Sequence, residues 1–275
     1  MQDTQRNISD IFRDLIPEEY RQTAKQMTTD EYLQSQCDWY NESEGHLDGY
    51  DCTECKNRGY FQTLDGNGGY TLKECKCMTT RRYITAMKAA GLGELYEKCT
   101  FDAYIVQNEW QRTCKALAMR YAAQDGNGWF YFGGNTGAGK THLCTAICSE
   151  LAKKGRQILY VQWKRLLAQL IQTKFKQYEQ EQLFNECIYA DVLYIDDFLK
   201  TPRNAPPSEE SLSYALEIVD ARYKADKKTI FSSEFMTKEI LSFDEALGGR
   251  IVEMSKGNKV LLERETGRNY RTNGE

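Results

Sequence analysis

The feature that most constrains this chain is a glycine-rich stretch, Gly134-Asn135-Thr136-Gly137-Ala138-Gly139-Lys140-Thr141, which reads G-x-x-x-x-G-K-T. The aromatic run before it, Trp129–Phe132, reads as a strand, and the segment from His142 onward reads as a helix. In this context glycines let backbone N–H groups point at phosphate oxygens, and the helix N-terminus favours an anion. The pattern predicts a phosphate-binding P-loop rather than an ordinary glycine turn.

The P-loop pattern also assigns roles to individual side chains. Lys140 would reach the β- and γ-phosphates of a nucleoside triphosphate, and Thr141 would ligate Mg²⁺. ATP and Mg²⁺ are therefore the predicted cofactors. The predicted nucleotide-binding residues are Gly134, Asn135, Thr136, Gly137, Ala138, Gly139, Lys140, Thr141 and His142.

A second motif follows downstream, where the apolar segment 191–198 reads as a buried strand that closes on two acids. Asp196 would hold Mg²⁺ through its water shell, and Asp197 would orient or polarise the attacking water. A pair of acids that merely caps a strand is the alternative. The P-loop upstream favours the catalytic interpretation, which is the Walker B pattern of an ATPase.

Four cysteines form a third pattern, C-x2-C followed by C-x-C, with nineteen residues between the pairs. The segment between them reads as a hairpin, 60–64 and 70–72 around a turn at 65–69, which would bring the pairs together. Four thiolates suit a closed structural Zn²⁺ site without a catalytic role. Unconnected free thiols, an iron–sulfur cluster, or replacement of one ligand by Cys37 or His46 remain alternatives. The predicted zinc ligands are Cys52, Cys55, Cys75 and Cys77.

Composition narrows the class of protein. The chain has 275 residues, 41% hydrophobic and 28% charged, which fits a soluble protein with one large and one small domain. It shows neither a membrane-length apolar run nor a signal peptide, so we expect a cytoplasmic protein with no membrane partner. Residues 1–80 carry 8 Lys+Arg against 15 Asp+Glu, whereas residues 81–275 carry 28 against 25. The acidic part is unsuited to nucleic acid.

Periodicity gives the remaining elements. A basic helix from residue 163 to about 180 carries Lys164, Arg165, Lys174 and Lys176, which would either track a nucleic-acid backbone or form a solvated face. An amphipathic helical region at 8–35 would either dock on a partner or cover the cysteine module. The other expected elements are a helical connector at 79–98 broken near 91–93, a helix at 109–124, strands at 157–161, 227–234 and 259–263, and a short helix at 237–247.

In this order, the motifs resemble the DnaC/DnaI-type helicase loaders, a branch of the AAA+ ATPases that includes many phage proteins. The resemblance covers roughly residues 50–275. It is carried by the cysteine module, Thr100-Phe101-Asp102, Gly134–His142, Leu193–Phe198, Ile230–Glu234, Arg250–Met254 and Asn269-Tyr270-Arg271.

The resemblance implies an α/β fold: an AAA+ P-loop NTPase with a parallel sheet sandwiched by helices, no substantial C-terminal lid, and a small N-terminal helical and zinc-binding domain. It implies domains at 1–80 (helicase-binding), 81–99 (helical linker) and 100–275 (ATPase). It also implies a slow ATPase that binds the hexameric replicative helicase, self-associates through its ATPase domains, and helps place the helicase on single-stranded DNA.

The resemblance further implies a polar sensor residue and an arginine finger. The sensor position is occupied by Ser233-Glu234, and we assign it to Ser233 because a carboxylate would repel the γ-phosphate. Arg250 is the predicted finger, with an intramolecular salt bridge as its alternative, and Arg271 is a second candidate. A transposition helper ATPase and a non-catalytic helicase-binding adaptor are the competing functions.

Overall fold

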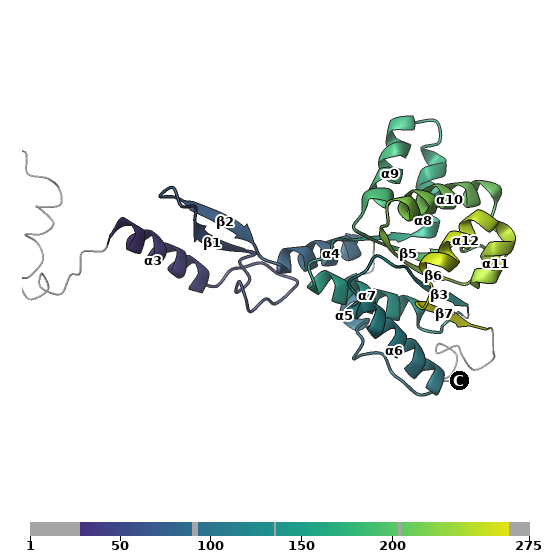
Figure 1. The fold of residues 1–275 in the computed structure, drawn as a ribbon, viewed down its shortest axis with the longest axis horizontal. Helices are drawn as coiled ribbons and strands as arrows, with labels where there is room; N and C mark the ends of the chain where they lie inside the picture. The colour runs from purple at the N-terminus through teal and green to yellow at the C-terminus, as the bar shows by residue number, and fades with distance from the viewer. Residues whose placement is uncertain (1–27, 90–92, 135, 203–204, 264–275) are drawn as a thin grey trace, which may run out of the picture. The chain divides into compact units, whose positions relative to one another are not determined.

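A computed structural model describes residues 28–89, 93–134, 136–202 and 205–263 (Figure 1). The chain divides into two compact units, residues 1–75 and 76–275, and the division falls within the second cysteine pair. Most of the helical region expected at 8–35 lies outside the described residues, as do Arg271 and the segment on which the expected absence of a lid depends.

The first unit contains one described helix, α3 (Thr29–Glu42), and a hairpin of β1 (Tyr60–Leu64) and β2 (Tyr70–Glu74). The helix begins at a capping box, because the Thr28 hydroxyl accepts from the Glu31 N–H and the Glu31 carboxylate accepts from the Thr28 N–H. The hairpin is the one predicted from the sequence.

The hairpin is fixed by its turn and by α3. In the turn, the Asp65 carboxylate accepts from the backbone N–H groups of Asn67 and Gly69 at 2.8 and 2.9 Å. On the helix, the Asn41 amide pairs with both backbone groups of Gln62, at 2.9 Å each. Since an amide offers both a donor and an acceptor, this one side chain sets the position of β1 against α3.

The second unit is built on a five-stranded parallel sheet with the order β4-β5-β6-β3-β7. Parallel strands end at one edge, so the segments that follow β3, β5 and β6 meet there. The strands are β3 (Phe130–Gly134), β4 (Ile158–Gln162), β5 (Val192–Phe198), β6 (Lys228–Ser233) and β7 (Lys259–Leu262). The predicted parallel sheet is confirmed.

Helices cover both faces of this sheet in two groups (Figure 1). Successive side chains of β3 point to opposite faces: Phe130 meets Tyr121 of one group, and Tyr131 packs with Phe231 in the large core under the other. One group is α4 (Cys77–Ala89), α5 (Gly93–Lys98), α6 (Glu109–Ala123) and α7 (Lys140–Lys153). The other is α8 (Trp163–Gln172), α9 (Gln177–Tyr189), α10 (Glu209–Lys224), α11 (Thr237–Phe243) and α12 (Glu245–Met254).

The region predicted as a linker helix packs on the rest of the second unit. Tyr83 and Met87 of α4 are buried, and the Thr80 hydroxyl donates to the Ala152 carbonyl of α7 at 3.2 Å. Both α4 and α5 contact α7, so they belong to the second unit.

Two helix predictions were wrong in their boundaries. The single basic helix from residue 163 is two helices, α8 and α9: α8 ends at its C-cap Thr173, whose backbone leaves the helical conformation and whose hydroxyl donates to the Gln169 carbonyl at 2.8 Å. The expected short helix at 237–247 is also two helices, because Asp244 caps a new one through the Leu247 N–H. Gly248, expected to follow a helix, lies inside α12, where a β-carbon would come within 2.6 Å of the Leu241 backbone.

Within the described residues, no helix is both long and apolar enough to cross a membrane.

Candidate functional site

The loop between β3 and α7 has the backbone that the glycine pattern predicts. Gly134 has φ 108°, and a β-carbon there would overlap the Leu262 carbonyl. Gly139 has φ 79° and caps α7, and a β-carbon would lie 2.8 Å from the Tyr104 ring. Both positions therefore require glycine. Asn135 lies outside the described residues.

Lys140 begins α7 and folds back over this loop. Its Nζ donates to the Gly134 carbonyl at 3.0 Å, and the side chain is buried. Burial lowers the pKa of Lys140, and the nearby carboxylates of Glu234 and Asp197 oppose that shift. The ammonium group is thus held beside the loop where a phosphate would sit.

Asp196 is buried at the end of β5 and accepts hydrogen bonds from hydroxyl groups of four elements. Its Oδ1 accepts from Thr141 at 3.1 Å, from Tyr194 at 2.8 Å and from Ser232. Its Oδ2 accepts from Tyr160 at 3.2 Å. Donors on several sides hold the carboxylate in one orientation. Thr141 and Asp196 thereby present a hydroxyl and a carboxylate side by side, which are the oxygen ligands that Mg²⁺ prefers.

Asp197 adopts a different backbone conformation from the strand before it. Its φ is 52°, in the left-handed region, and the register of β5 against β6 shifts between Ile195 and Phe198. Its N–H donates to the Ser232 hydroxyl at 3.0 Å, and its carboxylate pairs with Lys200 at 3.0 Å. This bulge turns the Asp197 side chain toward the cavity that Asp196 also lines.

A cavity of about 470 Å³ opens beside these groups. Its polar lining comes from the P-loop between Thr136 and His142, the two aspartates, Lys200 and Glu234. Its apolar and aromatic lining comes from Leu95, Tyr104, Ile105 and Trp110. Polar groups for phosphates beside apolar walls for a base suit a nucleotide.

His142 helps to fix Tyr104 of the cavity lining. Its Nε2 lies 2.8 Å from the Thr100 carbonyl, and its ring meets the Tyr104 ring edge-on at 5.2 Å between centroids. Thr100 belongs to the Thr-Phe-Asp sequence noted above, so that motif positions the segment that covers the P-loop.

The structure does not bring Ser233 together with these residues. Its hydroxyl is buried, donates to the Phe198 carbonyl at 2.8 Å and accepts from the Phe235 N–H at 3.1 Å. The cavity is instead lined by Glu234, and the hydroxyl that reaches Asp196 belongs to Ser232. Successive side chains of a strand point to opposite faces, so Ser232 faces Asp196 while the neighbouring Ser233 faces away from it.

Arg250 lies on α12, away from the cavity lining. Its guanidinium pairs with Asp220 of α10 at 2.5 Å and donates to the Ala246 carbonyl at 2.9 Å. The guanidinium also lies over the Tyr223 ring at 5.6 Å. Within one chain, therefore, Arg250 makes the salt bridge that was the alternative to an arginine finger, and its side chain remains 27% exposed.

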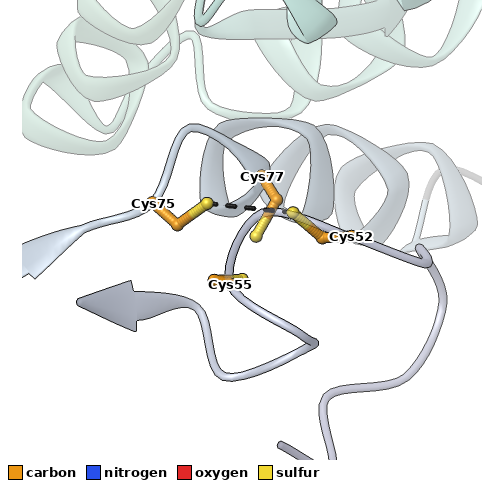
Figure 2. A group of neighbouring side chains, drawn as sticks. All are labelled: Cys52, Cys55, Cys75 and Cys77. Atoms are coloured by element: carbon orange, nitrogen blue, oxygen red, sulfur yellow. Dashed lines mark hydrogen bonds between the residues drawn. The ribbon is translucent and has the colours of Figure 1, made fainter. Parts of the chain in front are cut away.

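The four predicted zinc ligands lie together (Figure 2). Their sulfur atoms all lie within 4.8 Å of one another, and the Cys52 and Cys75 sulfurs are 3.8 Å apart. A tetrahedral site with Zn–S bonds of about 2.3 Å separates its sulfurs by about 3.8 Å. Neither Cys37 nor His46 belongs to this group among the described residues.

The backbone around the cysteines also suits thiolates. Lys56 and Asn57, with φ 46° and 64°, turn the chain back after the first pair, and the Gly59 N–H donates to the Cys55 sulfur at 3.2 Å. The Cys75 N–H donates to the Gly59 carbonyl at 2.8 Å, which ties the second pair to the same turn. All four cysteines are buried, so the residues present fit a closed structural Zn²⁺ site.

Lys200 is a site residue that the sequence prediction missed, and Glu234 was set aside in favour of Ser233. Lys200 follows Asp197 by three residues but belongs to no motif with a fixed spacing. Tyr160 and Tyr194 were likewise expected only as strand residues. The contacts that give these side chains a role arise from the alignment of β4, β5 and β6.

This fold, with a P-loop after β3 and paired acids at the end of β5, defines a P-loop NTPase of the AAA+ class. The bacterial DnaA ATPase domain matches residues 95–255, more than half of the chain. The chain belongs to this family, and the predicted resemblance to DnaC/DnaI-type loaders is confirmed by the relatives described next.

Three relatives are informative. YqaM of Bacillus subtilis is 28% identical to this chain. The alignment covers 69% of this chain but only 63% of the length of YqaM. The phage-like element PBSX protein XkdC of Bacillus subtilis is 26% identical, over 80% of this chain and 85% of XkdC. The replicative helicase loader DnaC of Escherichia coli K12 is 28% identical, over 66% of this chain and 76% of DnaC.

A solved structure shares the fold. The crystal structure of the DnaC helicase loader aligns with a TM-score of 0.51 and 20% identity, over 62% of this chain and 98% of that one. The predicted AAA+ fold is therefore confirmed.

Proposed function

We propose that this protein is an ATP-dependent loader of the hexameric replicative helicase. The observation that carries this proposal is the convergence of Lys140, Thr141 and Asp196 on a cavity of nucleotide size, in a chain related to helicase loaders. A loader needs a nucleotide-responsive site and a separate surface for the helicase. The chain offers the first in its sheet unit and a candidate for the second in its cysteine-rich unit.

The site supports slow ATP hydrolysis. Lys140 and the P-loop N–H groups would hold the phosphates, and Asp197 would orient the attacking water. Thr141 and Asp196 would hold Mg²⁺, which neutralises charge on the phosphates when it is bound. Positioning and charge compensation are the main protein contributions to such a reaction. The buried, hydrogen-bonded Asp196 would supply positioning, and the Lys140 ammonium would compensate charge on the phosphates.

The N-terminal part, residues 1–80, is proposed as the helicase-binding domain. Residues 81–99, whose helices pack on α7, would connect it to an ATPase domain at 100–275. Zn²⁺ on the four cysteines would supply the folding energy that a small hairpin lacks. Tyr32 and Trp39 lie on one face of α3 and are exposed, and the hairpin exposes Tyr70 and Leu72. Exposed apolar side chains of this kind suit a protein partner.

Single-stranded DNA is proposed as a second ligand, because basic and aromatic residues alternate between α8 and α9. Phe175 is 96% exposed and Tyr178 is 73% exposed, next to Lys174 and Lys176. Exposed rings stack on unpaired bases, and lysines attract the phosphates. Both lysines form surface ion pairs, with Glu210 and Glu179, and such pairs exchange readily for phosphate.

We propose that the ATPase domains self-associate through Arg250. Its guanidinium would leave Asp220 and contact the ATP bound to a neighbouring subunit. A protein that loads a DNA helicase in this way would act in the cytoplasm.

Size-exclusion chromatography with the replicative helicase of the source cell, with and without ATP and Mg²⁺, tests the proposal. We expect co-elution in both conditions and a larger assembly with ATP. Failure to co-elute with the helicase in either condition, combined with co-elution with a duplex-bound transposase, would favour a transposition helper instead. Unchanged helicase assembly and loading without ATP would favour a non-catalytic adaptor.

A further inference from the structure

Lys200 joins two of the carboxylates that line the cavity. Its Nζ lies 3.0 Å from Asp197 Oδ2 and 3.1 Å from Glu234 Oε1. Lys200 itself lines the cavity, together with Lys140 and the P-loop. This side chain therefore places a second ammonium group in the site, beside that of the P-loop lysine.

The backbone explains how Lys200 reaches this position. Asp197 and Leu199 have φ 52° and 59°, and the Lys200 N–H donates to the Asp197 carbonyl at 3.0 Å. This turn reverses the chain directly after β5 and sends Lys200 back over the strand end. Glu234 follows β6, the neighbouring strand, so one lysine bridges the ends of both strands.

The charges show why a second cation matters. Three carboxylates, those of Asp196, Asp197 and Glu234, line the same cavity as the Lys140 ammonium. Burial alone would lower the pKa of Lys200, but its hydrogen bonds and charge interactions with Asp197 and Glu234 raise it above the ordinary value. Lys200 is thus a protonated group, held by the acids that would otherwise repel a phosphate.

An ammonium group has three N–H donors and no acceptor. Two donors serve Asp197 and Glu234, and a third is available to a phosphate oxygen in the cavity that Lys200 lines. Asp197 lies at the carboxyl end of β5 and Glu234 directly follows β6, so Lys200 is held at the sheet edge where parallel α/β folds bind their ligands.

We propose that Lys200 binds the γ-phosphate and makes the site select nucleoside triphosphate over diphosphate. This inference rests on the proposed nucleotide site and assigns its phosphate specificity. It also gives Glu234 a role: instead of repelling the γ-phosphate, Glu234 holds the lysine that binds it.

Binding of β,γ-methylene-ATP and of ADP to the full-length zinc-loaded protein tests this inference, by competition against a fluorescent ADP derivative with Mg²⁺. We expect Lys200→Met to weaken the triphosphate analogue by at least about 10-fold and ADP by less than about 2-fold, because a lost charge-assisted hydrogen bond is worth roughly that factor. Lys200→Arg should retain most of the preference. Lys256→Met, at an exposed lysine outside the cavity lining, is the matched control.

A double variant separates binding from repulsion. Lys200→Met with Glu234→Gln also neutralises one of the two carboxylates that contact Lys200, so it should recover part, but not all, of the lost triphosphate affinity. Equal loss of ADP and triphosphate binding in Lys200→Met, or no loss at all, would overturn the inference while the proposed nucleotide site stands. A wild-type protein that binds neither nucleotide would refute the proposed function itself.

Discussion

The Thr141 hydroxyl donates a hydrogen bond to Asp196 Oδ1 over 3.1 Å, and this contact links the first turn of α7 to the end of β5. The two residues are 55 positions apart in the sequence. Their contact is possible because β3 and β5 are parallel and end at the same sheet edge, on either side of β6. The nucleotide site is therefore a consequence of sheet order and of two short motifs.

The role of Asp197 leads to the first prediction. Asp197→Asn should retain nucleotide binding and lower ATP hydrolysis by about 100-fold, because an amide cannot orient or polarise water as a carboxylate does. Asn tolerates the φ of 52° at this position, so folding should be unaffected. Phosphate release and nucleotide affinity, measured on the same sample, check this. Hydrolysis at the wild-type rate would remove Asp197 from the mechanism.

The same backbone angle predicts that glutamate, the longer acid, is not a neutral replacement for Asp197. Asp197→Glu places a longer side chain in the left-handed region, which should cost about 1 kcal/mol of unfolding free energy. Thermal unfolding without nucleotide measures this cost, with Asp197→Asn as the reference. A variant as stable as the wild type would show that the backbone is not under this constraint.

The motifs predicted the core of the site because their spacing reflects backbone geometry that only glycine or a buried strand can supply. Gly134, Gly139 and Lys140 have the conformations and burial that this requires. Side chains outside a motif were predicted less well. The polar residue that contacts Asp196 is Ser232 rather than Ser233, and a shift of one residue in a strand end cannot be read from periodicity.

The ends of two helices were also predicted wrongly, because no sequence pattern marks them. Neither Thr173 nor Asp244 is accompanied by proline, so no strong breaker marks the ends of α8 and α11. Thr173 and Asp244 make only local hydrogen bonds to backbone groups three or four residues away, and residues of both types also occur inside helices, so neither marks a boundary in the sequence. The glycines within α12 were expected to lie outside a helix, yet Gly248 is there to let α11 approach closely.

Arg250 provides a prediction about assembly. Arg250→Ala should lower ATP hydrolysis at least about 100-fold in the self-associated protein, if the guanidinium reaches a neighbour's ATP. Asp220→Asn breaks the same intramolecular salt bridge but keeps the arginine, so it should preserve activity. Hydrolysis rates measured as a function of protein concentration compare the two. Equal, small losses in both variants would mean that Arg250 only supports α10 and α12.

The cysteine cluster predicts one Zn²⁺ per chain. Cys75→Ser should lose zinc and expose the hairpin to protease, because three thiolates and a hydroxyl bind zinc far more weakly than four thiolates. Cys37→Ser is the control, since Cys37 is buried in α3 but lies outside the cluster. Metal analysis and limited proteolysis report both effects. Loss of zinc from the Cys37 variant would make that residue a ligand.

Lys228 predicts a pH dependence of stability. Its side chain is buried over the Tyr121 ring, and its Nζ has no hydrogen-bond partner in the described chain. Burial lowers its pKa to about 8. The unfolded state therefore binds more protons between about pH 8 and pH 10.4, so this residue's contribution to stability rises with pH in that window.

Substitution of Lys228 tests whether its contribution to stability rises with pH. Lys228→Met should stabilise the protein by about 1–3 kcal/mol at pH 7, and the gain should shrink as the pH rises from 8 to 10. Chemical unfolding of both proteins at several pH values measures it. A gain that stays constant with pH would mean that packing, rather than charge, sets the difference.

The most direct test of the central claim is a loading assay on single-stranded DNA, with the replicative helicase, ATP and either the wild-type protein or Lys140→Ala. The variant lacks the ammonium group that the P-loop holds over the Gly134 carbonyl. The account predicts that Lys140→Ala still binds the helicase but no longer loads it. Loading by Lys140→Ala at the wild-type rate would contradict an ATP-dependent loader.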